Sequence, residues 1–264
     1  MTTRTKSKIR SLGDIGAFIA LLLGMGFLLV YHAEELGYHW QWYRIPKYFF
    51  LSREGTLVSG PLIRGLLVTC RITLVSFVLA FVIGLVTALL RLSRSMVCAA
   101  LARVYLEVVR NTPLLVQIFF VYFVLGPILG ISRFYAAVLA LSFFEGAYAS
   151  EIIRAGIVSI PREQWDAAYS LGLSKPGAYR KVILPQAIRW ILPPLTSQAI
   201  SLVKDSALVS TIAVYGLTMR GQEIISETYL VFEVWFTVAA MYLALALLLS
   251  TVINVMEHRL RIPG

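Results

Sequence analysis

Long apolar segments alternate with shorter polar ones along most of this chain of 264 residues. A helix needs roughly 17 to 25 mostly apolar residues to cross the hydrocarbon core of a bilayer, and six segments approach or meet this length. They are Ile15–Tyr31, Ile72–Leu90, Pro113 to about Ile131, a segment from near Phe134 to beyond Glu151, one from near Ala187 to near Tyr215, and Val234–Met256. The pattern predicts an all-α integral membrane protein with about six transmembrane helices.

The first 60 residues divide into three parts. Residues 1–14 form a basic tail, and Ile15–Tyr31 follows as a short, nearly uncharged helix. The basic start would also suit a signal peptide, but no small-x-small cleavage pattern follows, so we favour a retained transmembrane helix. Residues 32–60 are rich in aromatic side chains and predict an extracytoplasmic interfacial segment, with a carbohydrate platform as the alternative. Residues 61–264 then form the main transmembrane domain.

The distribution of charge predicts the topology. Only 14% of the residues are charged and 58% are hydrophobic, which separates the chain from ordinary soluble domains. The formal net charge of +10 would indicate a nucleic-acid partner in a soluble protein, but here the basic residues lie between apolar spans. Lys and Arg concentrate on the side that holds both termini and the connections after the second and fourth spans. The positive-inside rule therefore places both termini in the cytoplasm, with the lipid bilayer and not nucleic acid as a partner.

The sequence offers little for catalysis or metal binding. The three histidines, His32, His39 and His258, lie outside the apolar spans, and Cys70 and Cys98 do not have the spacing of zinc ligands. No GxxxxGK[ST] phosphate loop is present, so transport driven by ATP would need a separate ATPase chain. We expect a non-catalytic chain with no metal site and no cofactor of its own.

The polar stretch Ser159–Pro185 lies between two apolar spans and predicts a helix, a glycine turn and a second helix. Pro161 suits the first turn of a helix, because its missing N–H costs nothing there. Gly172 can end this helix in the left-handed conformation, Ser174 can cap the next one, and Pro185 restrains its end. A cytoplasmic element that docks on another protein and an ordinary amphipathic loop helix fit this pattern equally well.

Polar side chains inside the apolar spans mark a candidate substrate path. Charges at membrane depth cost about 2.5–3.5 kcal/mol each on insertion scales, so they tend to be paired or functional. The candidates are Gln117 in the third span, Glu145 in the fourth, and Gln198, Ser201, Lys204 and Asp205 in the fifth, which Pro193–Pro194 also kinks. Lys204 and Asp205 are adjacent, so their side chains diverge, and Glu145 is a candidate partner. A purely structural ion pair is the equal alternative.

Part of the polar stretch resembles the EAA loop of ABC importer permeases, whose pattern is E-A-A-x3-G-x9-I-x-L-P. The matching residues are Asp166-Ala167-Ala168, Gly172 and Val182-Ile183-Leu184-Pro185, with Asp for the Glu and Val for the first Ile. Other segments look like the polar-amino-acid (histidine/glutamine/glutamate-type) branch of these permeases: Arg110–Gln117, Gly146–Tyr148, Glu151–Gly156, Ile183–Ala187 and Lys204–Leu208. The resemblance covers about residues 60–258, and members of the family often have five spans.

The resemblance implies the type I ABC importer permease fold and a role as the permease subunit for a polar L-amino acid in the bacterial cytoplasmic (inner) membrane. The implied partners are a cytoplasmic ABC ATPase dimer that uses ATP and Mg, a second permease subunit of the same or a related chain, and an extracytoplasmic solute-binding protein. The residues expected to couple to the ATPase are Trp165, Asp166, Ala167, Ala168, Gly172, Leu184 and Pro185. The runner-up function is a secondary transporter or channel for a small polar solute.

Overall fold

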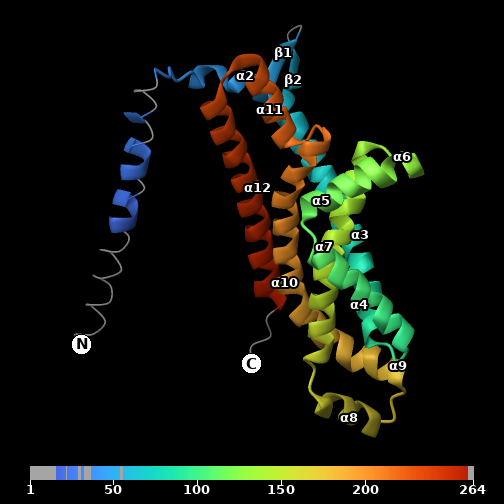
Figure 1. Cartoon of the computed structure of the whole chain (residues 1–264). Helices are drawn as coiled ribbons and strands as arrows, with labels where there is room; N and C mark the ends of the chain where they lie inside the picture. The colour runs from blue at the N-terminus through green and yellow to red at the C-terminus, as the bar shows by residue number, and fades with distance from the viewer. Residues whose placement is uncertain (1–15, 22, 29–30, 33–36, 54–55, 261–264) are drawn as a thin grey trace, which may run out of the picture. The chain divides into compact units, whose positions relative to one another are not determined.

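The computed structural model describes residues 16–21, 23–28, 31–32, 37–53 and 56–260 (Figure 1). The chain divides into two compact units, Met1–Tyr43 and Arg44–Gly264. In the first unit, Gly16–Leu28 is a short apolar helix at the place of the predicted first span. The predicted basic tail, residues 1–14, lies outside the described residues. Near the end of this unit, the rings of Trp40 and Trp42 are stacked with their centroids 6.0 Å apart.

Among the described residues, the regular elements of the second unit are helices and one short antiparallel hairpin, and helix η1 begins in the first unit and ends at Arg44. The hairpin pairs β1 (Phe50–Arg53) with β2 (Thr56–Ser59), so that Phe50 lies opposite Ser59. The other elements, in chain order, are η1 (Trp42–Arg44), α2 (Pro46–Phe49), α3 (Pro61–Leu92), α4 (Met96–Arg110), α5 (Leu114–Phe119), η2 (Phe120–Leu125), α6 (Gly126–Leu129), α7 (Arg133–Val158), α8 (Arg162–Ser170), α9 (Lys175–Ala178), η3 (Tyr179–Ile183), α10 (Leu184–Asp205), η4 (Ser206–Ile212), α11 (Leu217–Thr228) and α12 (Val231–Leu260). The hairpin lies within the aromatic segment that the sequence predicts to be interfacial.

Helix α2 belongs to the second unit, although the sequence groups it with the N-terminal segments. Ile45 and Tyr48 are buried in a cluster that also contains Leu62 of α3, Leu217 of α11 and Val234 of α12. These apolar side chains come from elements far apart in the chain, and their burial attaches α2 to the adjoining ends of the long helices.

Three helices in the described part of the chain are individually long and apolar enough to cross a membrane: α3, α7 and Val231–Ile253 of α12. Two further helix pairs meet the same criterion only when each bent pair is taken as one span. One joins Met96–Arg110 to Leu114–Leu129 with a bend of 105°, and the other joins Lys175–Ile212 to Leu217–Thr228 with a bend of 48°. Five spans in the second unit and the short helix of the first therefore correspond to the six predicted segments.

The third predicted span needs correction. The sequence predicts a helix from Pro113 to about Ile131 and treats residues 95–112 as a connection, but the structure makes both parts helical with a sharp corner between them. Pro113 has extended backbone (ψ 138°), and Nε2 of Gln117 donates to the carbonyl oxygens of Val109 at 2.7 Å and Thr112 at 3.0 Å. A proline disfavours helical backbone in the residue before it, which explains why the break falls there.

The fifth predicted span also begins earlier than expected. The sequence starts it near Ala187 and has Pro185 restrain the end of a separate helix, whereas the helix runs from Lys175 through Pro185 to Ile212. It passes Pro185 by widening into the π-helical segment η3, where the N–H of Leu184 donates to the carbonyl of Tyr179. A proline ring clashes with the carbonyl four residues earlier in an α-helix, and the wider turn relieves that clash. Segment η2 precedes Pro127 in the same way.

Small residues allow α3 and α7 to lie side by side (Figure 1). A Cβ atom added at Gly84 would lie 2.7 Å from Cβ of Ala149, and one added at Gly146 would lie 2.8 Å from Cγ2 of Ile83. Such contacts are shorter than van der Waals distances, so the two backbones approach as closely as they do only because both positions are glycine.

Candidate functional site

The polar loop between α7 and α10 folds as a short helix that a glycine turn ends. Pro161 immediately precedes α8, and Gly172 adopts a φ of +74°, as the sequence predicts. The N–H of Gly172 donates to the carbonyl of Tyr169, and the N–H of Leu173 donates to that of Ala168. This pair of bonds is a Schellman motif, which satisfies the last carbonyls of the helix. Ser174 occupies the predicted cap position of α9, but its side chain makes no capping hydrogen bond.

One face of α8 packs against the chain's own membrane helix. The ring of Trp165 meets that of Tyr179 edge-on, with 4.7 Å between the centroids, and Ala168 is buried. Nε2 of Gln186 donates to Oε1 of Gln164 at 3.1 Å. Two of the predicted ATPase-coupling residues, Trp165 and Ala168, therefore hold α8 in place and do not point outward.

The opposite face of α8 is exposed. Its residues include Glu163, Asp166 and Ala167, and Leu171 just beyond the helix is 79% exposed. Tyr169 borders this face: it is 44% exposed, and its ring centroid lies 6.4 Å from that of Trp165. Tyr169 and Leu171 were absent from the predicted coupling residues. Helical spacing alone does not identify them, because Tyr169 stands four residues after Trp165 and Leu171 follows the last residue of the helix. The predicted Leu184 and Pro185 are also exposed, but they lie on the long helix after the π-helical segment.

Three of the predicted path residues come together between α7 and α10. Glu145 is only 1% exposed, and Nε2 of Gln198 donates to its Oε2 at 2.5 Å. The carboxyl group of Asp205 lies close enough to interact with that of Glu145. The other carboxyl oxygen of Glu145, Oε1, is buried and has no hydrogen-bond partner in the described part of the chain. The arrangement leaves a buried acceptor that a cationic or N–H group of a ligand could fill.

The remaining path residues are placed differently. Lys204 is exposed, and among the described residues it forms no ion pair with Glu145. The carboxyl group of Glu145 is instead bonded to the neutral amide of Gln198. Ser201 is half-buried on α10. The amide nitrogen of Gln117 is engaged at the corner between α4 and α5 and does not join the Glu145 group.

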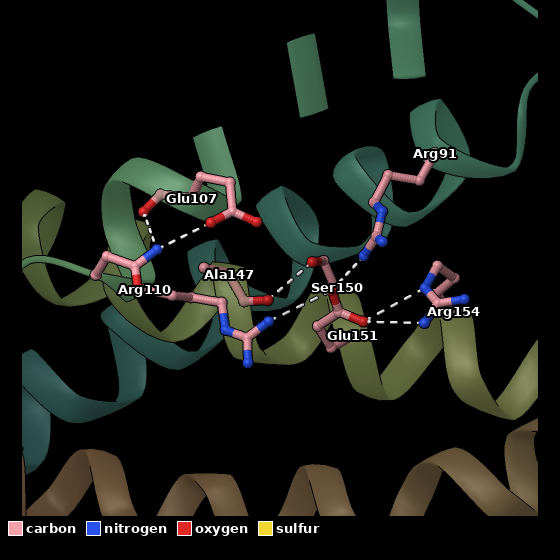
Figure 2. A network of polar contacts seen from close by, with 8 residues as sticks. Arg91, Glu107, Arg110, Ala147, Ser150, Glu151 and Arg154 are labelled. Atoms are coloured by element: carbon pink, nitrogen blue, oxygen red, sulfur yellow. Dashed lines mark hydrogen bonds and ion pairs between the residues drawn. The ribbon is translucent and has the colours of Figure 1, made fainter. Parts of the chain in front are cut away.

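A second polar group joins α3, α4 and α7, and the sequence interpretation did not find it (Figure 2). The carboxylate of Glu151 accepts a hydrogen bond from Nη1 of Arg91 and from Nε and Nη2 of Arg154, the last two at 3.3 and 3.2 Å. Nη1 of Arg110 lies 3.6 Å from the same carboxylate, and its guanidinium group lies over the ring of Tyr148 at 5.6 Å from the centroid. We call Glu151 and its three arginines the arginine hub.

No group of three or more His, Cys, Asp and Glu side chains with the geometry of a metal site occurs within the described ranges. The candidate functional groups are the Glu145–Gln198 pair with Asp205, the arginine hub, and the exposed loop helix α8.

The chain is similar in sequence to known proteins of one family. Residues 80–262 match the family model described as binding-protein-dependent transport system inner membrane component. The chain is 40% identical over 199 residues to the L-cystine transport system permease protein TcyB of Bacillus subtilis (strain 168), covering 74% of this chain and 85% of that protein. It is 39% identical over 204 residues to the glutamine transport system permease protein GlnP of Escherichia coli (strain K12), covering 76% of this chain and 93% of the relative.

Solved structures of two ABC transporters have a similar fold. A chain of an amino acid ABC transporter, crystallised with histidines, superimposes with a TM-score of 0.71 at 39% identity, covering 75% of this chain and 94% of the other. A chain of the MetNI methionine ABC transporter in an inward-facing conformation shares the fold, with a TM-score of 0.65 at 24% identity, covering 76% and 96% of the two chains. The resemblance that the loop motif indicated is confirmed, and the chain belongs to the family of binding-protein-dependent transport system inner membrane components, the permease subunits of ABC importers.

Proposed function

We propose that this chain forms the translocation path for a polar L-amino acid and couples its movement to a separate ATPase by alternating access. The observation that carries the coupling role is the division of α8 into two faces. Trp165 contacts Tyr179 of η3 and Gln164 bonds to Gln186 of α10, so a force on the exposed face of α8 reaches the membrane helix that carries Gln198. An exposed helix attached in this way suits docking on a partner that moves during a reaction cycle.

The contact surface proposed for the ATPase is the outer face of α8. It combines the charged side chains of Glu163 and Asp166 with the exposed Tyr169 and Leu171. Gly172 acts by shaping the end of the helix, and Leu184 and Pro185 lie where the loop joins the long helix. The ATPase pair would use ATP and Mg, whereas this chain would hold neither.

The proposed substrate path passes the Glu145, Gln198 and Asp205 group, with Ser201 and Lys204 on the same helix as secondary candidates. Oε1 of Glu145 has no partner among the residues that the structure describes, which supports a ligand that brings a donor, and every amino acid carries an ammonium group. The names of the relatives, which transport L-cystine and glutamine, support a polar amino acid as the substrate class. Gln117 has a structural role at the corner in this proposal.

The complete importer would contain two ATPases, this permease, a second permease subunit and an extracytoplasmic solute-binding protein in the bacterial inner membrane. Both termini of this chain would lie in the cytoplasm, because Lys and Arg concentrate on that side.

Reconstitution tests the proposal. The permease is placed in liposomes with its ATPase and solute-binding protein, and uptake is measured for a panel of radiolabelled amino acids. We expect uptake of at least one polar amino acid that requires both the binding protein and ATP on the face that bears the ATPase. Uptake that ignores ATP and follows a proton or sodium gradient would overturn the proposal in favour of a secondary transporter.

A further inference from the structure

The arginine hub carries more positive charge than its one carboxylate can balance. Three guanidinium groups, from Arg91 of α3, Arg110 of α4 and Arg154 of α7, surround the single carboxylate of Glu151. Three positive charges and one negative charge leave a formal surplus of two. Unbalanced charge next to apolar helices is costly and calls for a counterion.

The hub also has more hydrogen-bond donors than acceptors. Each guanidinium group has five N–H donors, whereas the carboxylate has two oxygen atoms. Within the described ranges, three donor nitrogens bond to Glu151, one from Arg91 and two from Arg154. Arg110 makes no hydrogen bond within the described residues, yet the ring of Tyr148 and the charge of Glu151 hold its guanidinium group beside the other two. Its donors are thus positioned and available.

Other nearby carboxylates do not remove this surplus. Glu107 of α4 lies near the hub in Figure 2, but its carboxylate accepts a hydrogen bond from Nδ2 of Asn111 at 2.9 Å. Within the described residues it forms no ion pair with the hub arginines. The side chains of Arg91, Arg110 and Arg154 are 21%, 45% and 33% exposed, so a ligand can reach them without unfolding the chain.

We propose that the arginine hub binds a phosphate group, supplied by the headgroup of an anionic phospholipid or by free phosphate. A phosphate presents several acceptor oxygens in a tetrahedral arrangement, so it can bridge guanidinium groups that come from three helices. Basic pockets between membrane helices are typical sites for anionic headgroups. A bound phosphate would hold α3, α4 and α7 in the arrangement seen here, and this role does not depend on which solute the protein transports.

The full-length permease, purified and incorporated into phosphatidylcholine vesicles with and without phosphatidylglycerol, tests this site. We expect phosphatidylglycerol to raise the thermal unfolding midpoint, and native mass spectrometry to detect the lipid retained on the wild-type chain. Arg110→Gln should weaken retention about tenfold, the effect of losing one charge-assisted contact, while leaving the bonds of Arg91 and Arg154 to Glu151 in place. Arg103→Gln, an exposed arginine of α4 outside the hub, is the matched control and should retain lipid like the wild type.

A second arm distinguishes the source of the phosphate. If inorganic phosphate raises the midpoint in pure phosphatidylcholine and phosphatidylglycerol adds nothing, the site takes free phosphate. Equal effects of Arg110→Gln and Arg103→Gln on retention would overturn the proposal, as would a wild-type midpoint that responds to neither lipid nor phosphate. If Arg110→Gln fails to fold, Arg154→Gln gives the same comparison. These readouts do not use amino-acid uptake, so their failure is separable from a failure of the proposed transport function.

Discussion

Gln198 of α10 donates a 2.5 Å hydrogen bond from Nε2 to Oε2 of Glu145 on α7. The two residues are 53 positions apart, and Glu145 is almost completely buried. Gln198 stands on the continuous helix Lys175–Ile212, which begins at the end of the polar loop. The same helix carries Tyr179, whose ring contacts Trp165 of α8. A displacement of the loop helix can therefore change the separation between Gln198 and Glu145.

Replacing Gln198 with Leu removes the donor and leaves the buried carboxyl group of Glu145 unsatisfied. Leaving a buried acceptor unsatisfied costs about 1–3 kcal/mol, so we expect ATP-driven uptake to fall by roughly tenfold. Uptake into liposomes at equal protein incorporation measures the effect. Thr196→Val is the control on the same helix, because its hydroxyl bonds only to backbone oxygens of α10, and it should retain nearly full uptake. Equal losses in both variants would contradict the role of Gln198 in the path.

The two faces of α8 predict different effects for two aromatic substitutions. Trp165→Ala removes the edge-on contact with Tyr179, worth about 0.5–1.5 kcal/mol beyond area burial, so the loop should exchange amide hydrogens faster in the isolated permease. Tyr169→Ala removes a ring that is 44% exposed and lies farther from Trp165, at 6.4 Å between centroids, so it should raise exchange less than Trp165→Ala but weaken co-purification of the ATPase. If Trp165→Ala leaves loop exchange unchanged and Tyr169→Ala leaves ATPase binding intact, the assignment of inner and outer faces is wrong.

Gly172 provides a test of the turn that ends α8. Its φ of +74° disfavours residues with a Cβ, but an added Cβ would meet nothing within 4 Å. The cost of substitution is therefore almost entirely conformational, about 1–2 kcal/mol for a β-branched residue. We expect Gly172→Val to increase amide exchange over α8 and α9 and to reduce uptake, whereas Gly172→Asn should be close to wild type, because Asn tolerates the left-handed region. Indistinguishable behaviour of Val and Asn would show that the turn does not depend on positive φ.

The close contact between α3 and α7 predicts that a Gly→Ala substitution lowers stability at Gly84 but not at Gly126. A Cβ at Gly84 would meet Cβ of Ala149 at 2.7 Å and the backbone nitrogen of Ser150 at 3.0 Å. Overpacking of this kind costs about 1–3 kcal/mol, so Gly84→Ala should lower the thermal unfolding midpoint of the purified permease. At Gly126 the nearest atom would be 3.6 Å away, so Gly126→Ala should be neutral or slightly stabilising. A midpoint for Gly84→Ala as high as that for Gly126→Ala would mean that the two helices can separate freely.

Local features of the sequence predicted well where local physics decides the outcome. Gly172 ends α8 because a residue without a Cβ enters the left-handed region at little cost, and this required no knowledge of the rest of the fold. Long apolar runs similarly predicted α3, α7 and α12. The loop motif identified the family, because its residues stand at a characteristic spacing in one short segment.

Predictions failed where two physical rules competed. Pro113 and Pro185 both disfavour an ordinary α-helical turn, yet one stands at a sharp corner and the other inside a continuous helix. At Pro113 the amide of Gln117 stabilises the corner, and at Pro185 a π-helical turn preserves the helix. Which solution a proline adopts depends on the neighbouring side chains and packing, and a single sequence does not display them.

By itself, the sequence determined that the chain is a helical membrane protein, where its main apolar helices lie, and which family its loop belongs to. These properties follow from hydrophobicity, helix periodicity and residue spacing, all of which act within short segments. The tertiary structure alone decided that Gln198 meets Glu145, that Trp165 faces inward, and that the arginine hub gathers on Glu151. These contacts join different helices, so they depend on how the helices pack and rotate about their axes, and close packing at residues such as Gly84 sets that arrangement.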